Sequence, residues 1–392
     1  MAGTADSCEA AATALQVVGE VSISPRTVNE LSANFGEQMS EQREARVEEF
    51  LERPLPRVYT TAQPPIQLAG VFCDGGRMRT RNASGQHGVH EPHWRETKNA
   101  AFHRMTTSSF DKDPQPTLPE CFRNQSYVEK LVLGLKKARN PQPEQMSHAT
   151  ETPPETIKEL LEPPEWQPKS LLRTCISSLT NSDDFGLQMA AEADARGFYT
   201  AAKRAFLGDG QAYNWTIQQR WFPTFTAIAD FIHIVEYIYE AAKALHSEKV
   251  ALWTQYLRWA EACWQGNVSI VIDELQQHMN LAKTNGVPET VLTALQRTHT
   301  YLENNRERMD YPRYRREGLP VTSSLAESLV KQISKRVKGT EKFWDDGPRG
   351  EAILQIRAAI ISQDQRLERF LRTRRISPYS PRCRISPAGA AA

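Results

Sequence analysis

LAGVFCDGG, residues 68–76, is the stretch of sequence from which the fold can be inferred. Its first six residues are almost continuously apolar, which is typical of a short strand buried on both faces of a sheet. The run stops at Asp74, so the sequence predicts an acid at the end of a buried strand. Asp-Gly pairs usually mark turns, and a plain turn is the simpler interpretation when Asp74 is considered alone.

Two further apolar runs downstream also end in an acid. AFLGDG, residues 205–210, ends at Asp209 and a glycine. TFTAIADF, residues 224–231, ends near Asp230 and His233. These runs predict neighbouring strands that each end at an acid.

The segments around these runs differ in character. In residues 77–105, apolar and polar side chains alternate often enough to predict further strands around a polar loop. Residues 111–169 are rich in proline and charge, which predicts loops and one helix near 126–137. A longer helix is predicted over about 184–204.

The second half of the chain predicts helices. Residues 234–313 show long helical periodicity, which indicates an all-helical block inserted within a mixed α/β domain. Residues 322–338 predict another helix, and Glu327 lies off its apolar stripe. That stripe consists of Leu325, Leu329, Val330, Ile333 and Val337. The cations that follow Glu327 on its own face are Lys331, Lys335 and Lys338. A solvated acid–lysine pair is the simpler interpretation of Glu327 considered alone.

Residues 24–52 predict an N-terminal helix, because Ser24 can cap it and Pro25 suits its first turn. Two interpretations stay open: residues 24–37 form a recognition helix, or the segment is a surface helix of a small N-terminal bundle. A Pro-rich connector follows at residues 53–67. The tail after residue 371 has the composition of a disordered segment.

Composition limits the class of protein. The 392 residues are 40% hydrophobic and 24% charged, which is ordinary for a globular protein with two or three structural units. No apolar run approaches the roughly 18 residues that span a membrane, and the N-terminus lacks the features of an export signal. Six cysteines stand singly, which fits a reduced compartment and argues against a zinc–thiolate site. The net charge is +1, but cations gather in the last third of the chain.

Acids at strand ends suit one kind of chemistry. Cutting a phosphodiester requires an activated water or hydroxyl and a stabilised leaving oxygen, which two divalent ions about 4 Å apart can provide. Mg²⁺ or Mn²⁺ prefers hard oxygen ligands, such as carboxylates on rigid elements. Asp74, Asp209 and Glu327 would meet that demand if their two strands and helix converge.

Four blocks of sequence carry a resemblance to a known family. They are VFCDGGRMRTR with HWRETK, then GDGQAYNW followed by FPTFTAIADFIHIVEYIYEAAKAL, then GLPVTSSLAESLVKQISKRVKGTEKFW, and finally ILQIRAAIIS. In this order, over about residues 70–370, they resemble the ISKra group of bacterial insertion-sequence transposases, which are allied with the Mutator-like DDE transposases. The resemblance implies an α/β (α+β) protein: an RNase H-like mixed-sheet core with an all-helical insertion between the second aspartate and the final glutamate, plus a small N-terminal helical region.

The resemblance also implies the catalytic residues. The family's first aspartate closes the first strand ahead of glycines and matches Asp74. The second sits in a DG turn ahead of an FP-containing strand and matches Asp209, while the glutamate of a small-residue block matches Glu327. The related Mutator group has an acid or cysteine followed three residues later by histidine, which Asp230 and His233 fit. Asp230 therefore competes with Asp209, and His233 either orients the substrate and braces the site or is a buried structural histidine.

Two clusters of side chains could each bind a ligand or be an ordinary part of the protein surface. The cations expected to hold DNA phosphates are Lys331, Lys335, Arg336 and Lys338, and the alternative is a solvated helix face. His87, His90 and His93 are spaced by threes and could suggest zinc, but a polar loop without cysteine is the simpler interpretation.

The implied activity is metal-dependent strand cleavage and strand transfer at the ends of an insertion sequence. Its cofactors would be two Mg²⁺ or Mn²⁺ ions bound by Asp74, Asp209 and Glu327. Its partner would be double-stranded DNA, as terminal inverted repeats and as target, held by a homo-oligomer in a bacterial cytoplasm at the nucleoid. The alternatives are a degenerate transposase-derived DNA-binding protein and an RNase H-like nuclease that cuts without joining. The expected boundaries are 1–60 for the N-terminal helical, candidate DNA-binding region, 66–233 for the first part of the core, 234–313 for the insertion, 314–370 for the final core region and 371–392 for a basic tail.

Overall fold

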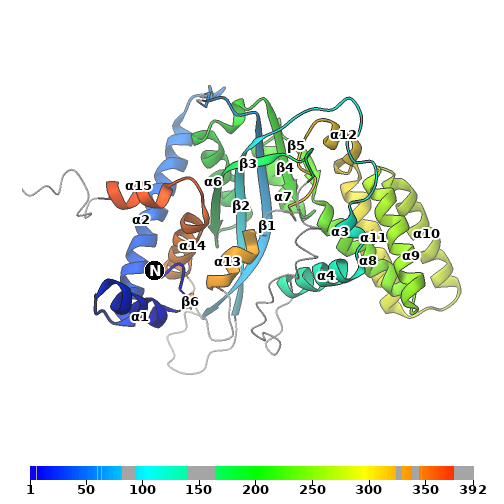
Figure 1. Cartoon of the computed structure of the whole chain (residues 1–392), viewed down its shortest axis with the longest axis horizontal. Coiled ribbons are helices and arrows are strands. Elements are labelled where there is room, and N and C mark those ends of the chain that lie inside the picture. Colours follow the sequence, from blue (N-terminus) through cyan, green and yellow to red (C-terminus); the bar gives the residue numbers. More distant parts are fainter. Residues whose placement is uncertain are drawn as a thin grey trace, which may run out of the picture.

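A computed structural model of the chain describes residues 1–5, 7–59, 61–62, 64–81, 93–139, 164–323, 329–337, 344–345 and 347–374. Figure 1 shows a central sheet with helices beside it and a block of helices at one end. No helix in these ranges is long and apolar enough to cross a membrane. Most of the tail expected to be disordered, residues 375–392, lies outside the described residues.

The sheet is mixed, as the sequence predicted. Its strands in the described ranges are β1 (Leu68–Arg81), β2 (His93–Thr106), β3 (Lys169–Ser178), β4 (Lys203–Gly208), β5 (Thr226–Ala229) and β6 (Trp344–Asp345). The order is β3-β2-β1-β4-β5, and β6 pairs with the far end of β1. The first three strands pair antiparallel, whereas β4 is parallel to both β1 and β5. The chain is therefore a mixed α/β protein.

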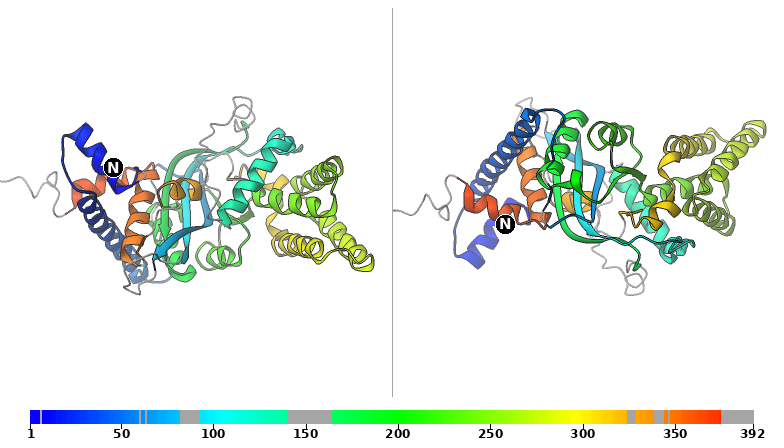
Figure 2. Two further views of the ribbon diagram at one scale, coloured as in Figure 1. Left: turned by 90° about the horizontal axis from the view of Figure 1, so that it is seen from below. Right: turned by 90° about the horizontal axis from the view of Figure 1, so that it is seen from above.

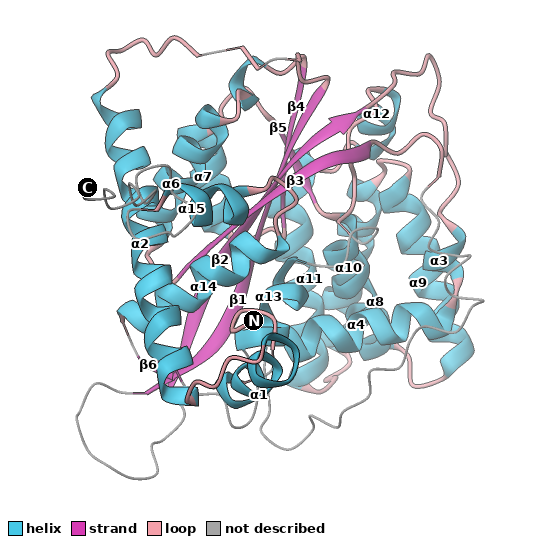
Figure 3. Ribbon diagram, turned by 60° about the vertical axis from the view of Figure 1, so that its left-hand side comes forward, coloured by secondary structure: helices cyan, strands magenta, loops and turns pink. Residues whose placement is uncertain are grey.

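The first strand does not end at Asp74, so that part of the prediction is wrong. β1 continues to Arg81 and stays paired with β2 from Leu68 to Thr80. Figure 3 shows β1 and β2 extending well past β4 and β5. The cross-strand hydrogen bonds of β2 override the turn preference of Asp-Gly, because strand formation depends strongly on the neighbouring strand. What ends at Cys73 is only the pairing of β1 with β4.

The helices agree with most of the sequence predictions. They are α1 (Cys8–Gly19), α2 (Pro25–Glu52), α3 (Glu120–Arg123), α4 (Gln125–Arg139), α6 (Ser182–Ala195), α7 (Ala212–Trp221), α8 (Phe231–Leu245), α9 (Lys249–Trp264), α10 (Val268–Thr284), α11 (Glu289–Asn305), α12 (Tyr311–Arg316), α13 (Leu329–Val337), α14 (Pro348–Ile361) and α15 (Arg366–Thr373). The helical prediction for residues 234–313 is confirmed by α8 to α12.

Two predicted helices have different bounds. The helix expected over 184–204 ends at Ala195, because Gly197 takes a left-handed conformation (φ 70°) and lies so close to Ala62 that a side chain would clash. The chain then enters β4. The helix expected from residue 322 is described only from Leu329, and Ser323 lies in a bend outside it.

The helix α2 forms an outer layer over α14. Figure 2 shows α14 between α2 and the sheet, and Gly36 of α2 approaches Ala352 of α14 so closely that a Cβ would lie 2.3 Å from the Ala352 Cα. The side chain of Ser24 caps α2 and Pro25 opens it, as predicted. One face of the proposed recognition helix, residues 24–37, is thus covered by the rest of the fold.

A buried ion cluster ties α2, α6 and the C-terminal helices together. Glu192 of α6 accepts hydrogen bonds from Arg46 at 2.5 Å, from Arg196 at 2.5 Å and from Arg366. Asp364 joins the cluster through Arg196 and Arg366. Burial would raise the pKa of Glu192, but the charges of Arg366, Arg196 and Arg46 outweigh it and hold that pKa well below its ordinary value.

We expect Glu192→Gln to destabilise the fold by about 3–5 kcal/mol, because it leaves buried guanidinium groups without their shared carboxylate. The free energy of unfolding from urea titration measures this loss. The matched control is Glu368→Gln, which breaks the exposed pair with Arg372 and should cost less than about 1 kcal/mol. Equal losses in the two variants would show that the buried cluster stabilises the fold no more than an exposed ion pair does.

Candidate active site

Three aspartates lie in a row at the point where the parallel strands β1, β4 and β5 stop pairing with one another. Cys73 of β1 is aligned with Gly208 of β4, and Gly208 is aligned with Ala229 of β5. Asp74, Asp209 and Asp230 each follow directly after one of these aligned residues. Since neighbouring strands lie about 4.8 Å apart, the three acids occupy adjacent positions across one edge of the parallel sheet.

Asp209 is held by the first turn of α7. Its Oδ1 accepts hydrogen bonds from the Gln211 backbone at 3.1 Å and from Asn214 Nδ2 at 2.7 Å, and its Oδ2 accepts from Gln211 Nε2 at 2.8 Å. The Tyr301 hydroxyl of α11 donates to the Asp209 carbonyl at 3.1 Å. These bonds fix the carboxylate in a buried position.

Asp230 is the N-cap of α8 and binds the segment that precedes α13. Its Oδ1 accepts from the backbone of Ile232 at 3.3 Å and of Ser323 at 3.2 Å. Its Oδ2 accepts from the Ser323 hydroxyl at 2.5 Å. The third acid of the row therefore holds a remote part of the chain at the site.

His233 is buried on the first turn of α8 among acidic groups. Its Nδ1 lies 3.8 Å from Oε2 of Glu236, which is also buried. Burial by itself would lower the pKa of His233, but the Glu236 carboxylate and the negative charges of Asp209, Asp230 and Asp74 raise it to about 9. The imidazole is therefore protonated at neutral pH.

The negative charge of the row also affects the pKa of Asp74. Burial and then the negative charge of Asp209 raise the pKa of Asp74 to about 7, against the lowering effect of His233. Asp230 also raises it, although less than Asp209 does. Burial likewise raises the pKa of Asp230 itself, which His233 and Ser323 partly offset. Like charges this close disfavour full ionisation unless a cation joins them.

A lysine and a tyrosine flank the row, and the sequence did not single them out. Lys98 is paired with Gly75 across the sheet, forms a 2.9 Å ion pair with Glu96 and lies 5.5 Å from the Tyr213 ring centroid. The Tyr213 hydroxyl is buried without a hydrogen-bond partner among the described residues. Lys98 stands in the HWRETK block quoted from the sequence, which was the available signal for this cation.

Of the predicted site residues in and next to α13, Lys335 and Arg336 have described side chains. Glu327 and Lys338 lie outside the described residues, as does the side chain of Lys331. Lys335 is exposed on α13. Arg336 does not fit its predicted role: it is buried, donates to the Ala2 carbonyl at 2.6 Å and lies over the Trp344 ring. A buried arginine in such contacts is not available to a phosphate.

The histidine cluster proposed for zinc is only partly visible. His87 and His90 lie outside the described residues. His93 is in β2, where its Nδ1 is 3.0 Å from the Thr80 hydroxyl. Within the described ranges, no group of three or more histidine, cysteine or acidic side chains is arranged to hold a metal ion. Glu327, the third ligand expected from the sequence, is not in those ranges.

We expect His233 to make the metal-free protein less stable at alkaline pH. Its folded-state pKa of about 9 lies above the roughly 6.5 of an unfolded histidine, so its contribution is complete below pH 6.5 and is lost as the pH rises through 9. The free energy of unfolding in EDTA should fall by about 1–3 kcal/mol over that interval. In the His233→Gln variant this fall in the free energy of unfolding should be smaller. The control is His246→Gln, at the other end of α8, which should show the same fall as wild type. An unchanged pH dependence in His233→Gln would contradict the assignment.

No protein-family model matches the chain, and a search of the curated proteins found no match. The resemblance to insertion-sequence transposases therefore stays an expectation that rests on the quoted blocks, and the function has to be inferred from the row of acids.

Proposed function

We propose that this protein is a DDE-type transposase that cuts and joins DNA, with Asp74, Asp209 and Glu327 as ligands of divalent cations. The observation that carries the proposal is the row of acids across β1, β4 and β5. In α/β sheets, ligand sites form beyond the carboxyl ends of parallel strands, which is where Asp209 and Asp230 stand.

The electrostatics of the row favour a bound cation. Asp74 is disfavoured as an anion mainly by burial and by Asp209, and a divalent ion between the two carboxylates would remove that cost. Both groups offer the hard oxygen atoms that Mg²⁺ and Mn²⁺ prefer. The donor set therefore fits such an ion, with one further carboxylate required to complete it.

Glu327 can supply that carboxylate because the chain on both sides of it is near the row. Ser323, bound to Asp230, precedes it by four residues, a reach of at most about 14 Å. Helix α13, which starts two residues later, packs through Ile333 and Val337 against Met78 of β1. Met78 and Asp74 are four residues apart on one strand and thus share a face.

The contacts favour Asp209 over Asp230 as the second ligand. Asp209 follows the strand directly next to β1 and affects the pKa of Asp74 more strongly. Asp230 is engaged at both oxygens by the N-terminus of α8 and by Ser323. We assign Asp230 the role of positioning the segment that carries Glu327.

The residues have distinct parts in the reaction. When bound, the cations would activate water or a 3′-hydroxyl and stabilise the leaving oxygen. Asn214 and Gln211 hold Asp209 in place for them. His233 supplies positive charge beside the acids. Lys335 is an exposed cation that can contact phosphate without reading sequence.

The topology is compatible with the RNase H-like core that the resemblance implies. Three antiparallel strands lead into two parallel ones, and the helices α8 to α12 separate β5 from α13. In that interpretation the helical insertion lies between the second aspartate and Glu327, the arrangement expected from the sequence blocks.

The test uses purified protein, Mg²⁺ and duplexes that carry the inverted repeats bracketing the gene. Wild type should nick the repeat ends and join the freed 3′-hydroxyl to target DNA, and Asp74→Asn should abolish both steps. The control is Asp273→Asn, an exposed acid of α10, which should leave both unchanged. Nicking without joining would indicate a nuclease. If wild type and Asp74→Asn bind DNA equally and neither cuts it, the proposed enzymatic activity is refuted.

The same assay separates the two aspartates. Asp209→Asn should reduce cutting to background, because it removes a metal ligand. Asp230→Asn should lower the rate constant for cutting by only about 10–100-fold, because asparagine still caps α8 and the lost contact acts through Ser323. The reverse ranking would make Asp230 the ligand. Rate constants for single-turnover nicking measure both effects.

A further inference from the structure

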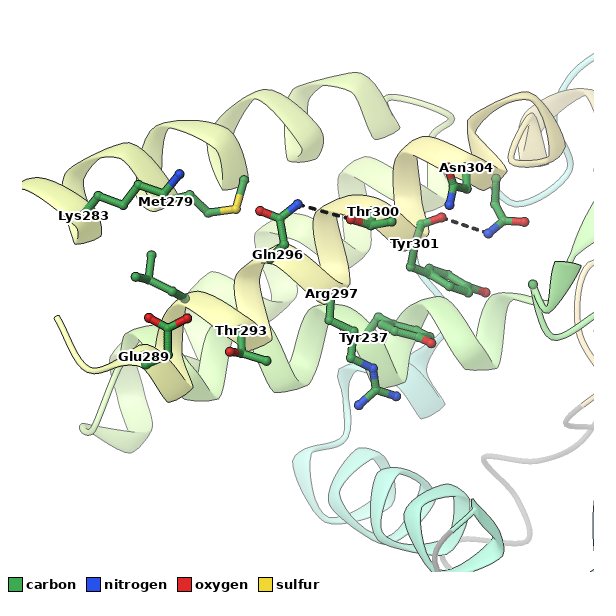
Figure 4. A pocket seen from close by; sticks show the side chains of 13 residues that line it. Tyr237, Met279, Lys283, Glu289, Thr293, Gln296, Arg297, Thr300, Tyr301 and Asn304 are labelled. Atoms are coloured by element: carbon green, nitrogen blue, oxygen red, sulfur yellow. Dashed lines mark hydrogen bonds between the residues drawn. The ribbon is translucent and has the colours of Figure 1, made fainter.

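A groove in the helical block opens beside the row of acids. It has a volume of about 780 Å³ and runs along α11, with α10 on one side and Tyr237 of α8 within it. One end reaches Gly210, the residue next to Asp209. Figure 4 shows its side chains extending along α11 from Glu289 to Asn304. The groove therefore borders the candidate active site at Gly210.

An aromatic stack leads from Asp209 into the groove. The Tyr301 ring packs on Gly210, where a Cβ would lie 2.3 Å from the ring and φ is 91°, so only glycine fits. Tyr237 stacks on Tyr301 with 3.8 Å between ring centroids and 12° between planes. The Arg297 guanidinium lies 4.9 Å from the Tyr237 centroid. Tyr301 is buried between Gly210 and Tyr237, and Arg297 lies over Tyr237, so the exposed layer of this stack is the Arg297 guanidinium.

Polar side chains run alongside this stack. Gln296, Thr300 and Asn304 are exposed on one face of α11 at intervals of four residues. Gln296 Nε2 donates to the Thr300 hydroxyl at 3.3 Å. Lys283 adds an exposed cation from α10, and the acid Glu289 lies at the end remote from Gly210.

We infer that the groove receives unpaired nucleotides of the DNA strand next to the cut. A guanidinium backed by aromatic rings, with Lys283 as a flanking cation, is a feature that binds single strands, because every base has a face that can stack on the guanidinium plane. The volume is within the range of small-molecule sites. A groove of about 780 Å³ can hold a few nucleotides of a single strand but is too small for a duplex. The inference rests on the proposed function, since it extends the same site.

The test compares three DNA probes in EDTA, where no cutting occurs. They share one duplex and differ in being blunt or carrying a three-nucleotide unpaired extension at the 3′ or the 5′ end, with 2-aminopurine in the extension. Wild type should bind one extended probe about 5- to 100-fold more tightly than the blunt probe, the range of one stacked base, and should quench its 2-aminopurine. Tyr237→Leu and Arg297→Gln should reduce that preference to nearly one.

Controls make the result specific to the groove. Lys249→Gln removes an exposed cation of α9 outside the groove and should keep the preference. Unchanged affinity of each groove variant for the blunt duplex shows that it has folded. Equal binding of all three probes by wild type, or a preference retained in both groove variants, overturns the inference. Nicking of the blunt duplex by wild type with Mg²⁺ is measured separately, so the proposed function can stand when the groove inference fails.

Discussion

The whole site depends on the register of three parallel strands. Because β1, β4 and β5 are aligned through Cys73, Gly208 and Ala229, the residues that follow them meet at one level of the sheet. Each of those residues is an aspartate. Placing three acids side by side is electrostatically unfavourable, and part of this cost appears in the pKa of Asp74, which burial raises most and the charge of Asp209 raises next. A protein keeps such an arrangement when a cation or a charged substrate compensates it.

The rest of the fold holds that row in place from both sides. Helices α13 and α14 cover the face of the sheet that carries Met78, α13 over β1 and α14 over β3, and α2 covers α14 in turn. On the other side, Tyr301 of the helical block donates a hydrogen bond to the backbone carbonyl of Asp209, and Tyr311 donates one to the carbonyl of Ala229, which precedes Asp230. The helical block is thus attached directly to the site, and movement of α11 would disturb Asp209.

Sequence patterns predicted the elements better than their ends. The apolar runs before Asp209 and Asp230 became β4 and β5, and the helical periodicity of residues 234–313 became α8 to α12. The predicted end of the first strand was wrong because pairing with β2 carries β1 past Asp74. The helix after residue 184 ended early because a close approach to Ala62 requires Gly197 to leave the helical conformation. Both errors come from contacts with residues remote in the sequence.

The sequence by itself determined which residue types stand where strands stop: an aspartate after each of three short apolar runs, and a histidine three residues after the last. It could not determine that the runs are neighbours at one level, because register is set by hydrogen bonds between strands, and β1 lies more than a hundred residues before β4 in the chain. Only the tertiary structure brought Asp230 to Ser323, buried Arg336 and placed Tyr237, Tyr301 and Arg297 in one stack. Local periodicity reports which face of an element is buried, whereas the partners on that face are chosen by packing.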